Sequence, residues 1–478
     1  MNMQERKKTK ILATLGPATA SKEVLRKMML AGADVFRINF SHADYDAVRE
    51  RVEMIRELNA ELGRHTGILA DLQGPKLRVG VMEDGIEVAP GDRIAFKTGE
   101  KFVGNKEAVY MTYPEFPRDV KPGERVLLDD GKLIFRVVET NSTDTVVAEV
   151  EQGGPLKSKK GVNLPNTNIS LPALTPKDIE DAIFAISLQV DWLALSFVRH
   201  AQDIKDLQKL ITKHSDYKIP IISKIEKPEA ITNIDEIVAF SDGIMVARGD
   251  LGVEVPAEEV PLLQKQLVQK SKEARIPVVI ATQMMETMMD SLTPTRAEVN
   301  DVGNSVMDGA DAVMLSGETS VGQYPVEVVA KMASIIRAVE NVDTFCAQTK
   351  PSLIRTNRFV SKAVCHHAAL LANEVEAKTI MTLTNSGYTA FQVSSWRPKS
   401  FILAFTDNRR ILGRLNLLWG VYAHYYDGYA STDETVEDII GIAKENNYLK
   451  KGDMAVTLTS MPIEKKGMVN SLRVTEVD

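Results

Sequence analysis

The chain has 478 residues, of which 44% are hydrophobic and 26% are charged, with a formal net charge of −7. This length predicts several domains with their own cores, and the acidic balance argues against nucleic-acid or anionic-membrane partners, which need a basic face. No apolar run approaches the roughly 20 residues that span a bilayer, and residues 1–10 lack the core of a secretory signal, so we expect a cytoplasmic protein. Cys346 and Cys365 have no metal-ligand spacing and are expected to be buried free thiols.

The first two thirds of the chain alternate between short runs rich in Val and Ile and longer segments with helical periodicity. This alternation is typical of βα units and a parallel sheet. The strand-like runs are KILATLG, DVFRINFS, TGILADLQ, DWLALSF, IPIISKIE, GIMVARGD, PVVIATQM and AVMLSGET. Eight is the number that closes a (β/α)8 TIM barrel. We therefore predict a barrel domain formed by residues 1–73 and 160–345.

Two further domains are predicted from changes in this pattern. Residues 74–159 contain alternating strands with an Asp-Gly hairpin signal in LLDDGK, which indicates an inserted all-β domain. The insertion falls in the third βα loop, on the face where barrels carry active sites, so it is placed to act as a lid. Residues 346–478 begin with a polar stretch and continue with AKTIMTLT, SFILAFT, GVYAHYY and DMAVTLT, which predict a separate open α/β domain.

Polar and charged residues gather where the predicted barrel strands end. Because these ends meet on one face of a barrel, and because a purely structural barrel would have no reason to bury unpaired charges there, the convergence predicts a functional site. In strand order the residues are Arg37, Asn39, Ser41 and His42; Asp71; Ser196; Lys224 and Glu226; Arg248, Gly249 and Asp250; Thr282 and Gln283; and Ser316 and Glu318.

Within this set, Glu226 and Asp250 suit a hard cation such as Mg²⁺, which keeps coordination positions for waters and substrate oxygens. Lys224 precedes Glu226 by two residues, so on a strand both side chains point to the same side. A cation beside a metal favours an anionic group such as a phosphate. The alternative is a structural Lys-Glu pair. In ARGDLG, Gly249 lets backbone N–H groups approach a ligand at a helix start.

Taken together, the motifs of residues 10–325 resemble the pyruvate kinase family. The matching motifs are KILATLGPA, RINFSHA, DLQGPKLR, SKKGVNLP, LSFVR, SKIEKPEA, IMVARGDLGVE, ATQMMETM, PTRAEVNDVGN and DGADAVMLSGET. Ala43 departs from a usual Gly, and Lys227 stands at a position that varies. The resemblance implies transfer of a phosphoryl group from phosphoenolpyruvate to ADP, a homotetramer, and regulation through the last domain.

The resemblance also implies a role for each matched site residue. Glu226 and Asp250 would hold Mg²⁺, or Mn²⁺ in its place, while Lys224 and Arg37 would stabilise the transferring phosphoryl group. The amides of Gly249 and Asp250, with Thr282, would bind the substrate carboxylate, and Thr282 could relay a proton to the enolate carbon. The residues expected to meet the ADP phosphates as the lid closes are His42, Arg78 and Lys160.

The segment DLQGPKLR carries Lys76 five residues after Asp71. Many members of the family bind a monovalent cation with residues matching Asn39, Ser41, Asp71 and the carbonyl of Leu72, and carry Glu where this chain has Lys76. The segment is similar to the branch that works without added potassium. We expect the Lys76 ammonium to replace the ion beside Asp71; the alternative is that this flexible side chain points to solvent.

In the last domain, the segment TLTNSGYTAF runs from a strand into a helix. Hydroxyls and free amides at a helix start suit a phosphate, and the resemblance implies a phosphorylated allosteric effector. The alternative is a simple helix cap, and Tyr388 stands where other members carry Arg or Lys. The predicted effector residues are Thr384, Asn385, Ser386, Gly387 and Thr389.

Two other classes of protein compete with the kinase. Metal-dependent lyases and aldolases on barrels also form pyruvate enolates at Glu and Asp carboxylates, but would lack the β lid and the last domain. A non-catalytic relative would have lost some of the central residues. Lys224, Glu226, Asp250 and Thr282 are all present.

Overall fold

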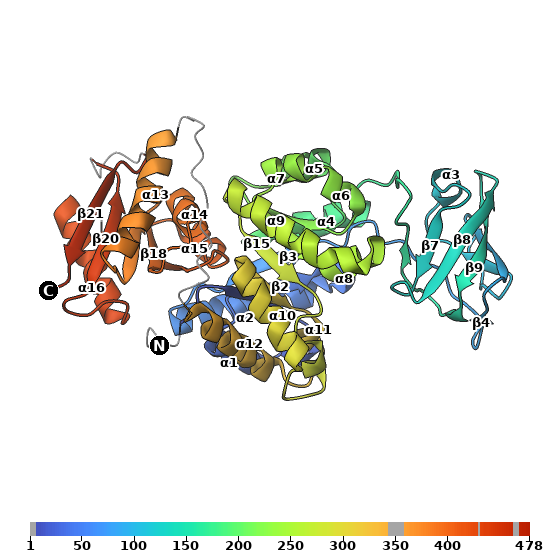
Figure 1. Cartoon of the computed structure of the whole chain (residues 1–478), viewed down its shortest axis with the longest axis horizontal. Coiled ribbons are helices and arrows are strands. Elements are labelled where there is room, and N and C mark those ends of the chain that lie inside the picture. The colour runs from blue at the N-terminus through green and yellow to red at the C-terminus, as the bar shows by residue number, and fades with distance from the viewer. Residues whose placement is uncertain (1–5, 343–357, 429–430, 462–467) are drawn as a thin grey trace.

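The computed structural model describes residues 6–342, 358–428, 431–461 and 468–478. Figure 1 shows the (β/α)8 barrel in the middle, the C-terminal domain at one end and the all-β domain at the other. Cys346 and the predicted boundary near residue 345 lie outside the described residues.

The eight predicted barrel strands are confirmed. They close in the order β1-β16-β15-β14-β13-β12-β3-β2, with every pair parallel. Nearly every strand residue is buried, which explains why these strands read as continuous apolar runs. Their bounds are β1 Lys10–Thr14, β2 Val35–Asn39, β3 Gly67–Asp71, β12 Trp192–Leu195, β13 Ile221–Ile225, β14 Gly243–Ala247, β15 Val278–Ala281 and β16 Ala312–Leu315.

Helices connect these strands and surround the barrel (Figure 1). Local sequence sets where they begin: Thr175 caps one helix in a reciprocal capping box with Asp178, with Pro176 in the first turn. The main helices are α1 Lys22–Ala31, α2 Tyr45–Leu62, α4 Pro176–Ser187, α5 Ala201–His214, α7 Ile234–Phe240, α9 Val260–Ala274, α10 Arg296–Asp308 and α12 Pro325–Glu340; the shorter ones are α6 Pro228–Thr232, α8 Arg248–Glu254 and α11 Gly317–Ser320.

The inserted domain is a six-stranded sheet in the order β11-β7-β8-β9-β5-β6, and its strand β11 lies beyond the predicted domain boundary at residue 159. The predicted hairpin turn is confirmed, since Asp129, Asp130 and Gly131 all have positive φ between β7 and β8. A separate apolar core fills this domain. Its elements are β5 Arg93–Lys97, β6 Ala108–Tyr110, β7 Arg125–Leu128, β8 Leu133–Thr140, β9 Thr145–Gln152 and β11 Val162–Asn163, with the unpredicted helix α3 Phe116–Asp119 and the small pair β4 Glu87–Val88 and β10 Gly154–Pro155.

The C-terminal domain is an open sheet in the order β19-β18-β17-β20-β21. Its four predicted strands are confirmed and are parallel, whereas the antiparallel edge strand β21 was not predicted. Cys365 is a buried free thiol, as expected, and burial raises its pKa to about 12. The elements are α13 Phe359–Glu374, β17 Thr379–Leu383, α14 Tyr388–Ser395, β18 Phe401–Thr406, α15 Arg409–Leu415, β19 Val421–Tyr425, α16 Thr432–Glu445, β20 Met454–Thr459 and β21 Ser471–Glu476.

Across the described ranges, no helix combines the length and apolar character needed to cross a membrane.

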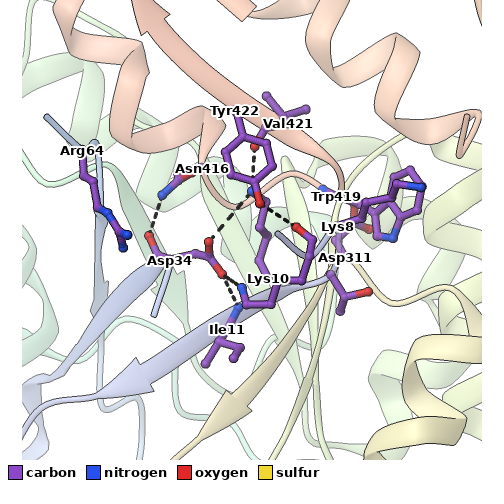
Figure 2. Close-up of polar contacts among 12 residues, drawn as sticks. Lys8, Lys10, Ile11, Asp34, Arg64, Asp311, Asn416, Trp419, Val421 and Tyr422 are labelled. Carbon is purple, nitrogen blue, oxygen red and sulfur yellow. Dashed lines mark hydrogen bonds and ion pairs between the residues drawn. The ribbon is translucent and has the colours of Figure 1, made fainter. Parts of the chain in front are cut away.

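A buried lysine joins the barrel to the C-terminal domain (Figure 2). Lys10 opens β1 with no exposed surface; its Nζ donates a hydrogen bond to the Val421 carbonyl at 2.6 Å and lies 4.2 Å from the centroid of the Tyr422 ring. Asp34 Oδ1 lies 3.9 Å from this ammonium, and Asp34 is also paired with Lys7. Burial lowers the pKa of Lys10 to about 8, although Asp34 opposes this shift.

A buried ion pair makes a second link between the same two domains. Arg397, just after α14, donates to both carboxylate oxygens of Asp311 at 3.1 and 2.8 Å, and each side chain is only 5% exposed. Asp311 directly precedes β16 and also accepts the amides of Val278 and Trp419. Both links lie at the amino ends of the barrel strands, so the C-terminal domain docks on the face opposite the strand-end residues.

The lowered pKa of Lys10 predicts a pH-dependent stability difference. The unfolded chain keeps this proton up to the ordinary pKa of 10.5, whereas the folded chain releases it near pH 8. Between these two values the unfolded state binds more protons than the folded state, so the free energy of unfolding rises as pH rises. The unfolding free energy of the wild type minus that of Lys10→Met, from urea titrations, should therefore rise by up to about 1.4 kcal/mol per pH unit between pH 8 and 10. A difference that stays flat with pH would contradict it.

Candidate functional site

One carboxylate organises two cations at the carboxyl ends of the barrel strands. Asp71 closes β3 and is 1% exposed; its Oδ2 accepts from Arg37 Nε at 2.6 Å, and its Oδ1 lies 3.3 Å from Lys224 Nζ. Arg37 comes from β2 and Lys224 from β13. The strand ends therefore bring these three predicted residues together.

Lys224 has two further partners. Its Nζ lies 3.0 Å from Glu226 Oε1, which confirms that the two side chains lie on the same side of the strand end. It also donates to Ser196 Oγ at 2.7 Å, and that hydroxyl donates to the Leu72 carbonyl at the same distance. Ser196 thus holds the ammonium between the third and fifth strands.

The charges at this centre support one another. Burial alone would raise the pKa of Asp71, but Lys224 and Arg37 bring it below its usual value. Burial alone would lower the pKa of Lys224, but Asp71 and Glu226 raise it above its usual value. Both groups are therefore charged at neutral pH, so the centre presents Arg37 and Lys224 as a pair of fixed cations.

One oxygen of Glu226 is suited to a metal ion. Its Oε2 accepts the Phe197 amide at 2.7 Å, while its Oε1 is buried, accepts no hydrogen bond and lies 3.0 Å from the Lys224 ammonium. Burial, and then the charge of Asp250, raise the pKa of Glu226, which a divalent cation would reverse. The described residues contain no group of three or more His, Cys, Asp or Glu side chains able to hold a metal. Two carboxylates such as Glu226 and Asp250 would leave most positions of a hard ion such as Mg²⁺ for other ligands.

Thr282 stands at a strained turn after β15. Its φ is 72° and that of Gln283 is 54°, in the left-handed region that side chains seldom adopt. Its hydroxyl accepts the Gly249 amide at 2.7 Å and donates to the Ala281 carbonyl. Arg248 steadies the turn by donating to the Thr282 carbonyl. The predicted carboxylate-binding groups are therefore adjacent, with the Gly249 amide already bonded to Thr282.

The predicted nucleotide-binding cations hold parts of the lid. Lys160 Nζ pairs with Asp129 Oδ1 at 2.8 Å, and Arg78 donates to the Lys159 carbonyl at 3.1 Å. Among the described residues, neither cation forms a hydrogen bond or ion pair with Lys224. His42 ends the short 3-10 helix η3 Phe40–His42, and its side chain lies outside the described part of the structure.

Lys76 is exposed and lines a cleft between the lid and the barrel, together with Phe197 and Asp250. Asp71 faces Arg37 and Lys224 instead, and within the described chain no hydrogen bond or ion pair joins Lys76 to it. Asn39 and Ser41 contact each other through the Asn39 side chain and the Ser41 amide at 3.1 Å. The structure does not bring Lys76 to Asp71, and its role stays a prediction.

Sequence reasoning missed several residues that orient the site. Thr14 Oγ1, at the end of β1, accepts from Arg37 Nη1 at 3.0 Å and donates to the Leu315 carbonyl. Thr14 lies at the end of a predicted strand, and this position could have identified it as a candidate site residue. Lys227 and Glu254 form a buried pair at 2.6 Å whose meeting no local pattern reveals. Glu318, in contrast, serves the backbone by accepting two amides.

The predicted effector loop forms a closed turn before α14. Gly387 has a φ of 84°, and its amide donates to Thr384 Oγ1 at 2.9 Å. Thr389 accepts a hydrogen bond from the Thr382 hydroxyl, and Asn385 and Ser386 accept through their carbonyls. The donor to Ser386 is Arg414, a cation that the sequence did not point to.

The barrel, its β lid and the buried cations and carboxylates define a class of protein: a barrel enzyme acting on anionic substrates at the carboxyl ends of its strands. Models of the pyruvate kinase barrel domain and of the pyruvate kinase alpha/beta domain match residues 6–329 and 362–475. The chain belongs to the pyruvate kinase family.

Individual relatives agree with this assignment. The chain is 41% identical to the pyruvate kinase of Geobacillus stearothermophilus over 98% of its own length and 80% of that protein. It is 43% identical to pyruvate kinase 2 of Synechocystis sp. over 94% of its length and 76% of that protein. A solved pyruvate kinase from Cryptosporidium parvum superposes with a TM-score of 0.91 at 34% identity, covering 99% of this chain and 96% of that one.

The chain is thus a phosphotransferase of glycolysis whose substrates are phosphoenolpyruvate and ADP. The lyase alternative fails, because the family matches extend over the barrel and the C-terminal domain together.

Asp71 should be essential as a positioning residue. In Asp71→Asn, Arg37 and Lys224 lose the negative charge that holds them together, so kcat/KM for phosphoenolpyruvate should fall by about a hundredfold. Steady-state kinetics measure this loss. The control is Asp206→Asn, which alters an exposed pair with Lys209 and should change nothing; a loss below about twofold in Asp71→Asn would refute the role.

Proposed function

We propose that this pyruvate kinase is Mg²⁺-dependent and that Glu226 and Asp250 hold the ion. The observation that carries the proposal is the buried Oε1 of Glu226, which accepts no hydrogen bond and lies beside the Lys224 ammonium. When bound, the cation supplies charge to the substrate oxygens during transfer.

In this proposal the chain's own cations act on the transferring group. Arg37 and Lys224 neutralise charge on the phosphoryl oxygens, which suits a reaction that needs positioning and electrostatic stabilisation more than covalent help. Asp71 and Thr14 keep Arg37 in place before substrate binds.

The remaining groups bind the ends of the two substrates. The amides of Gly249 and Asp250, with the Thr282 hydroxyl, bind the carboxylate of phosphoenolpyruvate, and Thr282 helps to deliver a proton to the enolate carbon. This assignment is supported by the strained turn that places Thr282 against the start of α8. On the lid side the ADP phosphates are bound by His42, Arg78 and Lys160.

Metal binding can be tested apart from turnover. Binding of Mn²⁺, followed by electron paramagnetic resonance in the presence of phosphoenolpyruvate, should weaken by at least about tenfold in Glu226→Gln, because the variant loses a charged ligand. Glu286→Gln is the matched control, since Glu286 is an exposed carboxylate after the seventh barrel strand. Equal Mn²⁺ affinity in wild type and Glu226→Gln would exclude Glu226 as a ligand.

We further propose that the enzyme works without potassium, with Lys76 supplying the positive charge near Asp71 when the lid closes. Support comes from the position of Lys76: it lies in the cleft between the lid and the barrel, and Gly74 and Pro75 before it connect the two. Asn39 and Ser41 remain the neighbouring positions where a potassium ion would otherwise bind.

The potassium proposal predicts opposite salt responses in two proteins. The wild type should be fully active in a buffer free of potassium and ammonium, whereas Lys76→Glu should lose at least about tenfold in kcat/KM and recover with potassium chloride but not with tetramethylammonium chloride. The readout is pyruvate formation with Mg²⁺ at matched ionic strength. A wild type that needs potassium would overturn the role of Lys76.

We also propose a cytoplasmic homotetramer regulated by a phosphorylated effector at residues 384–389. The closed turn at Gly387 and the nearby Arg414 support the effector site. Calorimetric titration with phosphorylated sugars and nucleoside monophosphates tests it, and light scattering measures the oligomeric state; no heat from any of these ligands, or a monomer, would count against the corresponding part.

A further inference from the structure

A buried carboxylate, that of Glu254, connects the lid to the barrel. Glu254 ends α8, one helical turn after Asp250, and its side chain has no exposed surface. Its Oε1 accepts two hydrogen bonds, from Lys227 Nζ at 2.6 Å and from Asn163 Nδ2 at 2.8 Å. Glu254 therefore has one partner in each domain.

The two donors come from functionally different segments. Lys227 directly follows Glu226 at the end of β13, so its pair with Glu254 ties together the two segments that carry the proposed metal ligands. Asn163 belongs to β11, the edge strand of the lid sheet. It follows Lys160 by three residues, and the intervening Gly161 forms a backbone bridge with Arg78.

The physical setting makes this contact strong and directional. Lys227 is 5% exposed, and breaking a buried ion pair on one side is costly, so the Lys227 and Glu254 pair keeps the carboxylate in one place. Asn163 then donates to a charged acceptor in a fixed position, which is a stronger bond than one between neutral groups. The lid hairpin also approaches α8, since a Cβ built on Gly131 would lie 3.7 Å from a methyl group of Val253.

We propose that Asn163, Glu254 and Lys227 form a hinge anchor that holds the base of the lid against the metal-binding loops while the lid closes, and that thereby positions the nucleotide-side cations for ADP. The inference rests on the proposed function, which assigns Arg78 and Lys160 to the ADP phosphates. All three anchor residues are positioning residues. Loss of a purely structural pair would weaken the binding of both substrates alike, whereas loss of the anchor weakens mainly the binding of ADP, the substrate that the lid binds.

The test compares two lid variants that each lose one side-chain hydrogen bond. Asn163→Leu removes the bond that crosses to the barrel; Gln152→Leu removes a bond to the Lys132 carbonyl that stays within the lid. We expect Asn163→Leu to raise KM for ADP by about tenfold, because the lid loses its hydrogen bond to a charged acceptor on the barrel. The calorimetric Kd for phosphoenolpyruvate with Mg²⁺ should stay within about twofold, because the barrel residues themselves are unchanged. Gln152→Leu should leave both values unchanged.

A second variant and a second readout complete the test. Asn163→Asp places a carboxylate against Glu254 and should raise KM for ADP further than Asn163→Leu, by like-charge repulsion. Hydrogen exchange of the amides in residues 160–164 should be faster in both variants than in the wild type, whether or not the enzyme turns over. An unchanged KM for ADP, equal losses for both substrates, or unchanged exchange would overturn the anchor, whereas a wild type inactive with both substrates would instead refute the proposed function.

Discussion

The site depends on one constraint, the burial of the Asp71 carboxylate between Arg37 and Lys224. Two cations in a buried centre repel each other, and a charge left without a partner there is costly. Asp71 resolves this conflict before any substrate arrives, and it can do so only because β3 lies between β2 and β12, with Asn39 and Ala194 as its backbone partners. Closure of the barrel is therefore what turns strand-end residues distant in sequence into one electrostatic unit.

Much of the fold could be predicted because buried strands and helices have recognisable patterns of apolar residues in the sequence. The barrel strands are buried on both faces, so each reads as an apolar run, and their polar ends predict Lys224, Glu226 and Asp250 as site residues. The apolar pattern of β21 is weaker, because its sequence SLRVTE is half-exposed and pairs antiparallel at a sheet edge. The contacts between domains have no local sequence pattern: Asn163 and Glu254 are 91 residues apart, and Lys10 and Val421 are 411 residues apart. Such pairs form only when the domains dock, and the periodicity of a local segment does not predict how domains dock.

The barrel carries a different kind of polar contact on each of its two faces. On the carboxyl face, Arg37 and Lys224 are held by carboxylates, and each keeps 12% of its side-chain surface exposed, which suits groups that meet a ligand. On the amino face, the Arg397 and Asp311 pair and Lys10 are covered by the C-terminal domain. These buried charges hold the two domains in one relative orientation, because each loses its partner if the interface shifts. The lid contacts the barrel through a smaller polar connection at Glu254.

The insertion of the lid after β3 also bears on how the chain folds. β3 pairs with β12, so Leu69 must find Trp192 across the whole inserted domain, a long loop whose closure is entropically unfavourable and slow. The lid has its own core and joins its own ends, since the Val79 amide bonds to the Lys160 carbonyl at 3.0 Å. A lid that folds first therefore shortens the effective loop between β3 and β12. The folded lid thus also offsets the entropic cost that its own insertion adds to closure of the barrel on which it rests.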